Sequence, residues 1–578
     1  MLQASISVLL KPGKDPMLCS SYRPISLLNC DIKLLTKIIA SRFNSLMQRL
    51  VAHDQVGFIR TREARDNTIR TINIIEKAKR SNTHLLLLST DAEKAFDRVD
   101  WGFLREALCS FGMPKPILDW ISALYSNPTA TLKYHQQFGG IFKMNLGIFK
   151  SVQIGDPDLL ETLLRKETMY PKRMEIKPWK MYREYRGEEY GLLTLEGEEW
   201  HNMRKTVQGH LMRPKEIAKM DVKINEVLKD FIKYISHICD QDGKIGDLYL
   251  ELNKLSYEII CSVLYNERCG LLQEACTEDA LTFIKSVKKM MQYLGPLIVT
   301  SADLHKQFNT RSWQKHTEAW DYIFSTAKCF IDKRLKSSPA WSNDLLNTIS
   351  SNHPLTKKQL SGLFTELQIG GVETTANSLL WLIYNLSRHS DVQEKVLDEI
   401  QAVLPPGQSP SADHLQKMPY LKACIKESMR LTPTVPFTSR TMEEDTNLGG
   451  YVIPRGVITM INFHAMTWNE DYFPDAREYK PERWLKPRAS VNPFASTPFG
   501  VGKRMCVGRR LAELQLQLAL CWIIQNFYIC ATDSEPCKGI ISGLMIPSRQ
   551  LPVSLKKRNR YLSHKKRSTF HLGTVLHD

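Results

Sequence analysis

The sequence lacks several features that would assign it to a common class of protein. Its 13 cysteines include no Cys-x-x-Cys pair, so we expect reduced thiols in a reducing compartment and no zinc or disulfide framework. No apolar run approaches the about 18 residues that span a bilayer. The beginning, MLQASISVLLKPGKDP, has no basic region before its short apolar run and lacks the Arg-rich pattern of a mitochondrial presequence.

No Gly-, Ser- or Pro-rich linker marks the joint between the first two parts of the chain, which differ in character. A length of 578 residues predicts two or more folding units. Residues 1–133 predict helices around one apolar strand, LLLLST, at 85–90. Residues 134–558 open with short strands, IFKMNLG and FKSVQIG, and continue mainly as helices, whereas residues 559–578 predict a basic, disordered tail. The expected fold class is mainly α with small β-sheets.

The net charge of +17 suggests nucleic-acid binding, but it is unevenly distributed along the chain. About +7 falls before residue 134 and about +6 after residue 555. The long middle is only mildly basic, so the two ends are considered separately from it.

The string FGVGKRMCVG, at 499–508, precedes a run of helical periodicity, RRLAELQLQLALCWIIQNF. Cys506 therefore lies at a helix N-terminus, where unpaired N–H groups and the helix dipole favour a thiolate. Arg504 can reach an anionic group. A tight turn close to a flat ligand is allowed by Gly500, Gly502 and Gly508. The alternative for a lone cysteine is a small buried apolar side chain.

The spacing Phe-Gly-x-Gly-x-Arg-x-Cys-x-Gly resembles the heme-binding loop of cytochromes P-450 at every defined position. The resemblance implies a cytochrome P-450 fold, a heme-thiolate monooxygenase activity and heme b, with Cys506 as the ligand of its iron. It also implies further heme contacts, some of them to the propionates, by Trp200, Arg204, Arg440, Phe499, Gly500, Arg504 and Gly508.

The stretch LFTELQIGGVETTANSLLWLIYNLSRH, at 363–389, predicts a helix of about 30 residues. Within it, the Thr374 hydroxyl can compete for the carbonyl four residues back. The stretch resembles the family's helix across the distal face of the heme, which implies space for dioxygen at Gly370 and Gly371. It also implies a proton relay through Glu373 and Thr374. Without that resemblance, a Glu-Thr pair is usually a polar turn on a solvated helix face.

Glu427 and Arg430 lie three residues apart, on one helix face. Such a pair is usually an unremarkable surface salt bridge. Together with Arg483 in PERW it resembles the family's structural triad, which holds the core on the proximal side of the heme.

Longer strings, among them MEIKPWKMYREYR and MPYLKACIKESMRLTPTVPFTSRT, resemble the mitochondrial cytochromes P-450 that hydroxylate vitamin D at carbon 24. This implies a secosteroid substrate, specifically 1,25-dihydroxyvitamin D and 25-hydroxyvitamin D. A different mitochondrial sterol hydroxylase is the alternative. The substrate pocket would be lined by Ile176, Trp179, Met291, Gly370, Val435, Phe437 and Thr438.

The same resemblance implies a peripheral location on the matrix side of the inner mitochondrial membrane. It also implies electrons from an acidic ferredoxin, adrenodoxin. A basic docking patch is expected from Lys422, Lys426, Arg509 and Arg510.

Residues before 134 resemble a different family. YRPISLLNCDIKLLTKIIASRF, QVGFIRTREARDNTIR and LLLLSTDAEKAFDRVDW resemble the fingers and early palm of a LINE-type reverse transcriptase, with Asp91 as a metal ligand and Phe96 as the steric gate. The sequence contains no Asp-Asp dipeptide, so the later palm motif is missing and we expect an inactive remnant. No specific nucleic-acid binding is expected. The open function classes are an active monooxygenase, a nucleic-acid-binding protein and a fusion without function.

Overall fold

The computed structural model divides the chain into two compact units, residues 1–127 and 128–578. It describes residues 5–10, 22–27, 64–81, 110, 130–146, 149–273, 278–299, 301–337, 344–405, 407–485 and 492–558. Asp91, Phe96, the strand expected at 85–90 and the tail at 559–578 lie outside these residues.

In the first unit, β1 (Ser5–Leu10) pairs antiparallel with β2 (Tyr22–Leu27), and α2 spans Ala64–Arg80. The expectation of a single strand before residue 134 was therefore wrong. The short apolar run at the beginning is a strand because a second extended segment, with Ser5 opposite Leu27, satisfies its main-chain groups.

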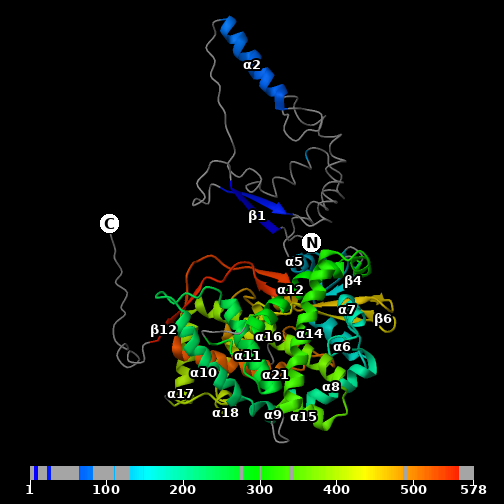
Figure 1. Cartoon of the computed structure of the whole chain (residues 1–578), viewed down its shortest axis with the longest axis vertical. Helices are drawn as coiled ribbons and strands as arrows, with labels where there is room; N and C mark the ends of the chain where they lie inside the picture. The colour runs from blue at the N-terminus through cyan, green and yellow to red at the C-terminus, as the bar shows by residue number, and fades with distance from the viewer. Residues whose placement is uncertain are drawn as a thin grey trace. The chain divides into compact units, whose positions relative to one another are not determined.

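The second unit is mainly helical, as expected (Figure 1). Its helices are α5 (Ala130–Phe138), α6 (Pro157–Arg165), α7 (Lys177–Arg186), α8 (Gly197–Leu211), α9 (Pro214–Ala218), α10 (Asp221–Ile238), α11 (Leu248–Tyr265), α12 (Glu278–Val299), α13 (Ala302–Gln307), α14 (Arg311–Ser337), α15 (Leu345–Asn352), α16 (Lys357–Ser387), α17 (Ser390–Val403), α18 (Ala412–Gln416), α19 (Pro419–Leu431), α20 (Phe463–Thr467), η2 (Pro481–Trp484) and α21 (Arg509–Asn526).

The strands of this unit form small sheets, and they are β3 (Ile141–Leu146), β4 (Phe149–Ile154), β5 (Phe437–Thr441), β6 (Thr446–Leu448), β7 (Tyr451–Ile453), β8 (Ile458–Asn462), β9 (Phe527–Ala531), β10 (Gly539–Ser542), β11 (Leu544–Pro547) and β12 (Val553–Lys557). The two strands expected just after residue 140 are β3 and β4. They join β8 and β5 in one sheet of order β3-β4-β8-β5, in which β4 and β8 run parallel.

α16 runs through the middle of this unit beside α11 and α21 (Figure 1). It begins in a capping box, in which the side chains of Thr356 and Gln359 each accept a hydrogen bond from the other residue's main chain. Most of its side chains are buried, as expected for a helix surrounded by protein. α11 packs so closely that a Cβ atom on Gly371 would lie 2.6 Å from Ile260 Cδ1.

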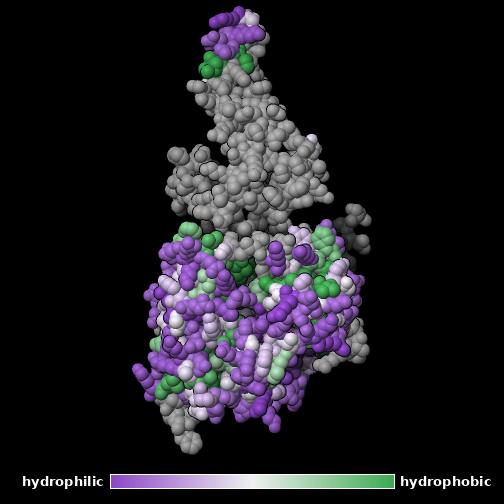
Figure 2. Space-filling model, turned by 90° about the vertical axis from the view of Figure 1, so that its right-hand side faces the viewer, coloured by the Kyte–Doolittle hydropathy of each residue, from purple (hydrophilic) through white to green (hydrophobic). Residues whose placement is uncertain are grey.

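The surface of this unit is mostly hydrophilic on the face drawn in Figure 2. Among the helices that the structure describes, none combines the length and apolarity that crossing a bilayer requires.

Candidate active site

The Cys506 loop is a tight turn immediately before α21. The Cys506 N–H donates to the Phe499 carbonyl at 2.9 Å. Gly500 and Gly502 have φ of 69° and 77°, in the left-handed region that favours glycine. A Cβ on Gly502 would also lie 2.7 Å from Glu167 Oε2, so the loop could not hold this shape with a larger residue.

Cys506 is an exposed residue, yet burial raises the pKa of its thiol. A hydrogen bond from the Gly508 N–H and the charges of Arg173 and Arg204 oppose that rise. The N–H donor expected at the start of α21 is therefore present, that of Gly508. In the free thiol, burial raises the pKa of Cys506 by more than this hydrogen bond lowers it. Among the described residues no group of three metal-binding side chains occurs.

Arg504 lies against Trp200, with its guanidinium carbon 3.7 Å from the ring centroid. It donates to the carbonyls of Pro171 and Leu195 at 2.8 and 3.2 Å, and to Glu196 at 2.7 Å. The sequence predicts that Arg504 reaches an anionic ligand. In the structure its nitrogens donate to one carboxylate and two carbonyls that distant segments bring to it, and the contact with an anionic ligand stays a prediction.

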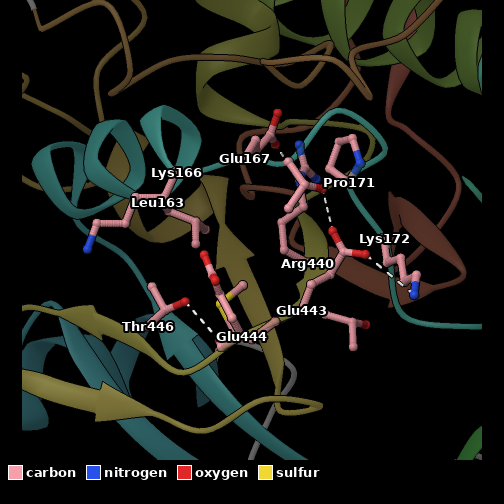
Figure 3. Close-up of a pocket in the computed structure, with 12 residues that line it drawn as sticks. Leu163, Lys166, Glu167, Pro171, Lys172, Arg440, Glu443, Glu444 and Thr446 are labelled. Carbon is pink, nitrogen blue, oxygen red and sulfur yellow. Dashed lines mark hydrogen bonds and ion pairs between the residues drawn. The ribbon is translucent and has the colours of Figure 1, made fainter.

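Arg440, on β5, is held in a similar way. It donates to Glu167 at 2.6 Å and to the Val501 carbonyl at 3.2 Å, which ties β5 to the Cys506 loop. Figure 3 shows Arg440 and Glu167 beside a small pocket that the Lys172–Glu443 ion pair also lines.

Arg173 is a residue that the sequence reasoning missed. Its Nη2 donates to the Arg504 carbonyl, but its Nε is buried without a hydrogen-bond partner among the residues described. Burial, followed by repulsion from Arg440 and Arg504, lowers its pKa to about 9. A buried, unsatisfied guanidinium among other cations indicates an anionic ligand. The sequence signal was an arginine next to Lys172, shortly before the predicted pocket residue Ile176.

Arg204, on α8, also has few hydrogen-bond partners among the described residues. Its hydrogen-bond partner in the described region is the weak acceptor Met212 Sδ, at 3.7 Å, and its guanidinium carbon lies 5.7 Å from the Trp200 ring centroid. Burial lowers its pKa, and Cys506 opposes that shift. A lone thiol with Arg173 and Arg204 beside it fits a metalloporphyrin that carries carboxylates.

The expected helix containing Thr374 is α16, and the predicted hydrogen bond is present: Thr374 Oγ1 donates to the Gly370 carbonyl at 2.6 Å. Gly370 is exposed although its neighbour Ile369 is buried, so this turn borders open space. Glu373 is buried and accepts a hydrogen bond from Tyr249 on α11 at 2.5 Å. Burial raises the pKa of Glu373, and the Tyr249 hydrogen bond opposes the rise.

The structure brings together the three predicted structural residues. The fully buried Arg430 and Glu427 form a two-pronged ion pair at 2.8 and 2.9 Å. Arg483 Nε donates to Glu427 at 2.8 Å, and Trp484 Nε1 donates to its other oxygen at the same distance. Arg430 also caps the Thr467 and Ala476 carbonyls, so the group clamps α19 to the segment before η2.

The predicted substrate residues lie on elements that are joined to α16. Ser378 of α16 lies 2.9 Å from the Thr434 hydroxyl, and Thr434 accepts from the Met545 N–H at 2.9 Å. Gly543, in the turn between β10 and β11, lies against Met291. A Cβ atom on Gly543 would be 3.2 Å from Met291 Sδ. The exposed Val435 and the half-buried Phe437, Thr438 and Ile176 belong to the adjoining segments.

Trp179 is placed differently. It is 3% exposed and packs edge-on against Trp320, with centroids 5.2 Å apart. This is a core position, since α7 packs its inner face on α12 and α14.

The four predicted docking cations lie on two helices that pack together, α19 and α21. Lys426 is exposed and Lys422 is half-buried, and burial followed by repulsion from Lys426 lowers the pKa of Lys422. Arg509 and Arg510, both exposed, are the first residues of α21, just after the Cys506 loop.

The cytochrome P-450 family model matches residues 120–555, and the chain belongs to this family. It is a heme-dependent monooxygenase. The model for reverse transcriptase (RNA-dependent DNA polymerase) matches residues 9–148, so this part of the chain is similar to that family. The two matched ranges overlap over α5 and β3, and these two elements belong to the second unit. There α5 packs on β3 and α20, and His135 Nε2 lies 2.9 Å from Asn462 Nδ2.

Three relatives that illustrate the similarity are mitochondrial enzymes. The 1,25-dihydroxyvitamin D(3) 24-hydroxylase of Rattus norvegicus is 52% identical over 440 residues, which are 76% of this chain and 86% of the relative. The 25-hydroxyvitamin D-1 alpha hydroxylase of Homo sapiens is 33% identical over 443 residues, 73% and 86% of the two chains. The sterol 26-hydroxylase of Mus musculus is 30% identical over 442 residues, 73% and 83%.

Proposed function

We propose that this chain hydroxylates the side chain of 1,25-dihydroxyvitamin D and 25-hydroxyvitamin D at carbon 24. The observation that carries the proposal is the difference in similarity: 52% identity to a 24-hydroxylase, against 33% and 30% to relatives that act elsewhere on vitamin D or on sterols. In this proposal residues 134–558 are the catalytic domain, residues 1–133 are an inactive polymerase remnant and residues 559–578 are a tail.

The chain's own residues would hold the cofactor in a defined way. Cys506 would bind the iron, while Arg173, Arg204 and Arg504 would meet the propionates. Among the described residues Arg173 Nε has no hydrogen-bond partner, and Arg204 is bonded to the weak acceptor Met212 Sδ. Trp200 and Arg440 would support that side of the site, with Phe499, Gly500 and Gly508 shaping the loop. When bound, heme supplies the activation of dioxygen.

Glu373 and Thr374 would deliver protons. One turnover converts R–H, O2, two protons and two electrons into R–OH and water. The proton path must therefore deliver two protons to the site in each turnover. The Thr374 hydroxyl borders the exposed turn at Gly370 and is hydrogen-bonded along α16. A hydroxyl held there can pass a proton from Glu373 inward.

The pocket would select the carbon by position, because neighbouring side-chain carbons differ little in reactivity. Ile176, Met291, Val435, Phe437 and Thr438 offer the apolar and weakly polar lining that a secosteroid needs. Gly370 leaves room at the turn beside Thr374, so a small change there would shift oxidation toward carbon 23. The buried Trp179, which packs on Trp320, would support the pocket wall from the core side.

Electrons would come from an adrenodoxin-type ferredoxin at the matrix side of the inner mitochondrial membrane. Lys422, Lys426, Arg509 and Arg510 lie on packed helices next to the Cys506 loop, which would place the acidic partner close to the thiolate.

Reconstitution of the full chain with adrenodoxin and its reductase tests the proposal. 25-hydroxyvitamin D and cholesterol would be supplied in parallel, and products would be identified by mass spectrometry. We expect 24-hydroxylated product from the vitamin D compound and none from cholesterol. Turnover of cholesterol alone would make the chain a different sterol hydroxylase.

A further inference from the structure

Arg183 on α7 and Glu366 on α16 form an ion pair in the interior of the second unit. Arg183 Nη2 donates to Glu366 Oε1 at 2.7 Å, and the two side chains are 0% and 1% exposed. The guanidinium also donates to the Trp179 carbonyl at 2.9 Å, and its central carbon lies 4.5 Å from the ring centroid of Trp320 on α14. Burial lowers the pKa of Arg183, and the charge of Glu366 opposes that shift. The pair therefore joins α7 to α14 and α16.

Glu366 also holds the segment between α7 and α8, residues 187–196. Its Oε2 accepts a hydrogen bond from the Leu193 N–H at 2.6 Å, and its Oε1 accepts one from the Thr194 hydroxyl at 2.8 Å. The fit is close, because a Cβ atom on Gly191 would lie 2.5 Å from Glu366 Oε2. Both carboxylate oxygens are bonded to other elements, so this carboxylate fixes where the segment lies on α16.

The same segment reaches the Cys506 loop. Arg504 Nη1 donates to the Leu195 carbonyl at 3.2 Å, and Nη2 donates to the Glu196 carboxylate at 2.7 Å. Leu195 and Glu196 directly follow Thr194, which is bonded to Glu366. A short stretch of chain thus connects Glu366 with an arginine close to Cys506.

Glu366 lies one turn before Gly370 and two turns before Thr374, so the three residues lie along one face of α16. Residues 187–196 cover this face at Glu366 and at Gly362, where a Cβ atom would lie 2.7 Å from a carbonyl oxygen of that segment. Gly370 is exposed, and a Cβ atom there would meet no described atom within 4 Å outside its own part of the helix. The covered part of the face therefore ends one turn before the open turn at Gly370.

Stability alone does not explain a buried ion pair at this place. Apolar residues of similar volume are often as stabilising as a buried pair, or more so. An arginine and a carboxylate differ from them in that their hydrogen bonds have fixed directions, so the groups that they join are held in one arrangement.

We propose that Arg183 and Glu366 are positioning residues that fix α7 and residues 187–196 against α16, and thereby determine which substrate carbon lies at the turn beside Gly370. The inference rests on the proposed function, in which Ile176, at the start of α7, and Gly370 line the substrate pocket. Neighbouring side-chain carbons differ little in reactivity, so a small displacement of α7 changes the ratio of products.

Arg183→Met combined with Glu366→Gln in the reconstituted holoenzyme tests the proposal. Either change alone leaves an unpaired buried charge that destabilises the fold, whereas the double change removes both charges and keeps the side chains similar in size. With 25-hydroxyvitamin D as substrate, we expect the ratio of oxidation at carbon 23 to oxidation at carbon 24 to change by about threefold or more.

A second readout needs no turnover. Imidazole and 4-phenylimidazole bind the heme iron of the holoenzyme, and the phenyl ring of the larger ligand also meets the pocket wall. The shift of the Soret band gives both dissociation constants. We expect their ratio to change by about threefold or more in the double variant, because the wall formed by α7 is displaced.

Arg334→Met combined with Asp344→Asn is the matched control. This pair is also buried, with side chains 10% and 0% exposed, and Arg334 donates to Asp344 Oδ2 at 2.9 and 2.7 Å. It joins α14 to the start of α15 instead of α7 to α16, and asparagine is as good a helix N-cap as aspartate. We expect both ratios to equal those of wild type.

An unchanged product ratio in the double variant of Arg183 and Glu366 would overturn the proposal. A change of equal size in the control would also overturn it, because any lost buried pair would then have the same effect. If the wild type hydroxylates no vitamin D compound, the proposed function is wrong. The ratio of the two dissociation constants then decides by itself whether the pair positions α7.

Discussion

Thr374 Oγ1 donates a hydrogen bond to the main-chain carbonyl of Gly370 at 2.6 Å, one turn earlier on α16. That bond points the hydroxyl along the exposed part of an otherwise buried helix. The most specific predictions about catalysis follow from this position.

Thr374→Ala should lower the product formed per NADPH by about tenfold or more, with peroxide formed instead, because it removes a proton donor without disturbing the thiolate. Product and peroxide would be measured against NADPH consumed. Thr375→Ala is the matched control, since the neighbouring Thr375 is 7% exposed and has no place in the relay. Equal coupling in the two variants would remove Thr374 from the mechanism.

Arg173→Met should speed heme loss from the holoenzyme by about tenfold, the usual value of a charge-assisted hydrogen bond. Heme transfer to an excess of a heme-scavenging apoprotein gives the rate. Arg165→Met, which removes only an exposed ion pair with Glu161, should leave it unchanged. A normal rate for Arg173→Met would mean that Arg173 does not hold the cofactor.

Glu427→Ala should lower the free energy of unfolding by about 3–5 kcal/mol, because it leaves Arg430 as an unpaired buried charge. Urea unfolding followed by circular dichroism measures the change. The exposed pair supplies the control: Glu161→Ala should cost less than about 1 kcal/mol. If the two variants lost similar stability, the clamp between α19 and η2 would not be structural.

Lys422→Glu combined with Lys426→Glu should raise the ferredoxin concentration needed for half-maximal turnover, by about tenfold or more at low salt. The heme spectrum should stay normal, and added salt should reduce the difference from wild type. Lys233→Glu with Lys229→Glu on α10 provides the same charge change elsewhere. An effect of equal size from that pair would place docking on another face.

The sequence predicted those parts of the site that are encoded locally. α21 follows from helical periodicity and α16 from the resemblance of its sequence to the family's distal helix. The Cys506 loop follows from its glycines, of which Gly500 and Gly502 have positive φ. The Thr374 hydrogen bond spans four residues of one helix, so it could also be foreseen.

The contacts that were missed join distant segments. Tyr249 meets Glu373 across 124 residues, because α11 packs on α16. Arg504 receives hydrogen-bond partners from around residues 171 and 196, because the fold brings those segments to the Cys506 loop. Arg173 was recognised as a candidate site residue because, among the described residues, its buried Nε has no hydrogen-bond partner. None of these pairings has a spacing that the sequence alone could reveal.

The reduced carbon monoxide complex of the purified holoenzyme is the most direct test of the central claim that Cys506 holds heme iron as a thiolate. The account predicts the red-shifted Soret band that a thiolate ligand produces, its loss in Cys506→Ala, and its retention in Cys530→Ala, which alters another free thiol. A thiolate-type band that survives in Cys506→Ala would contradict it.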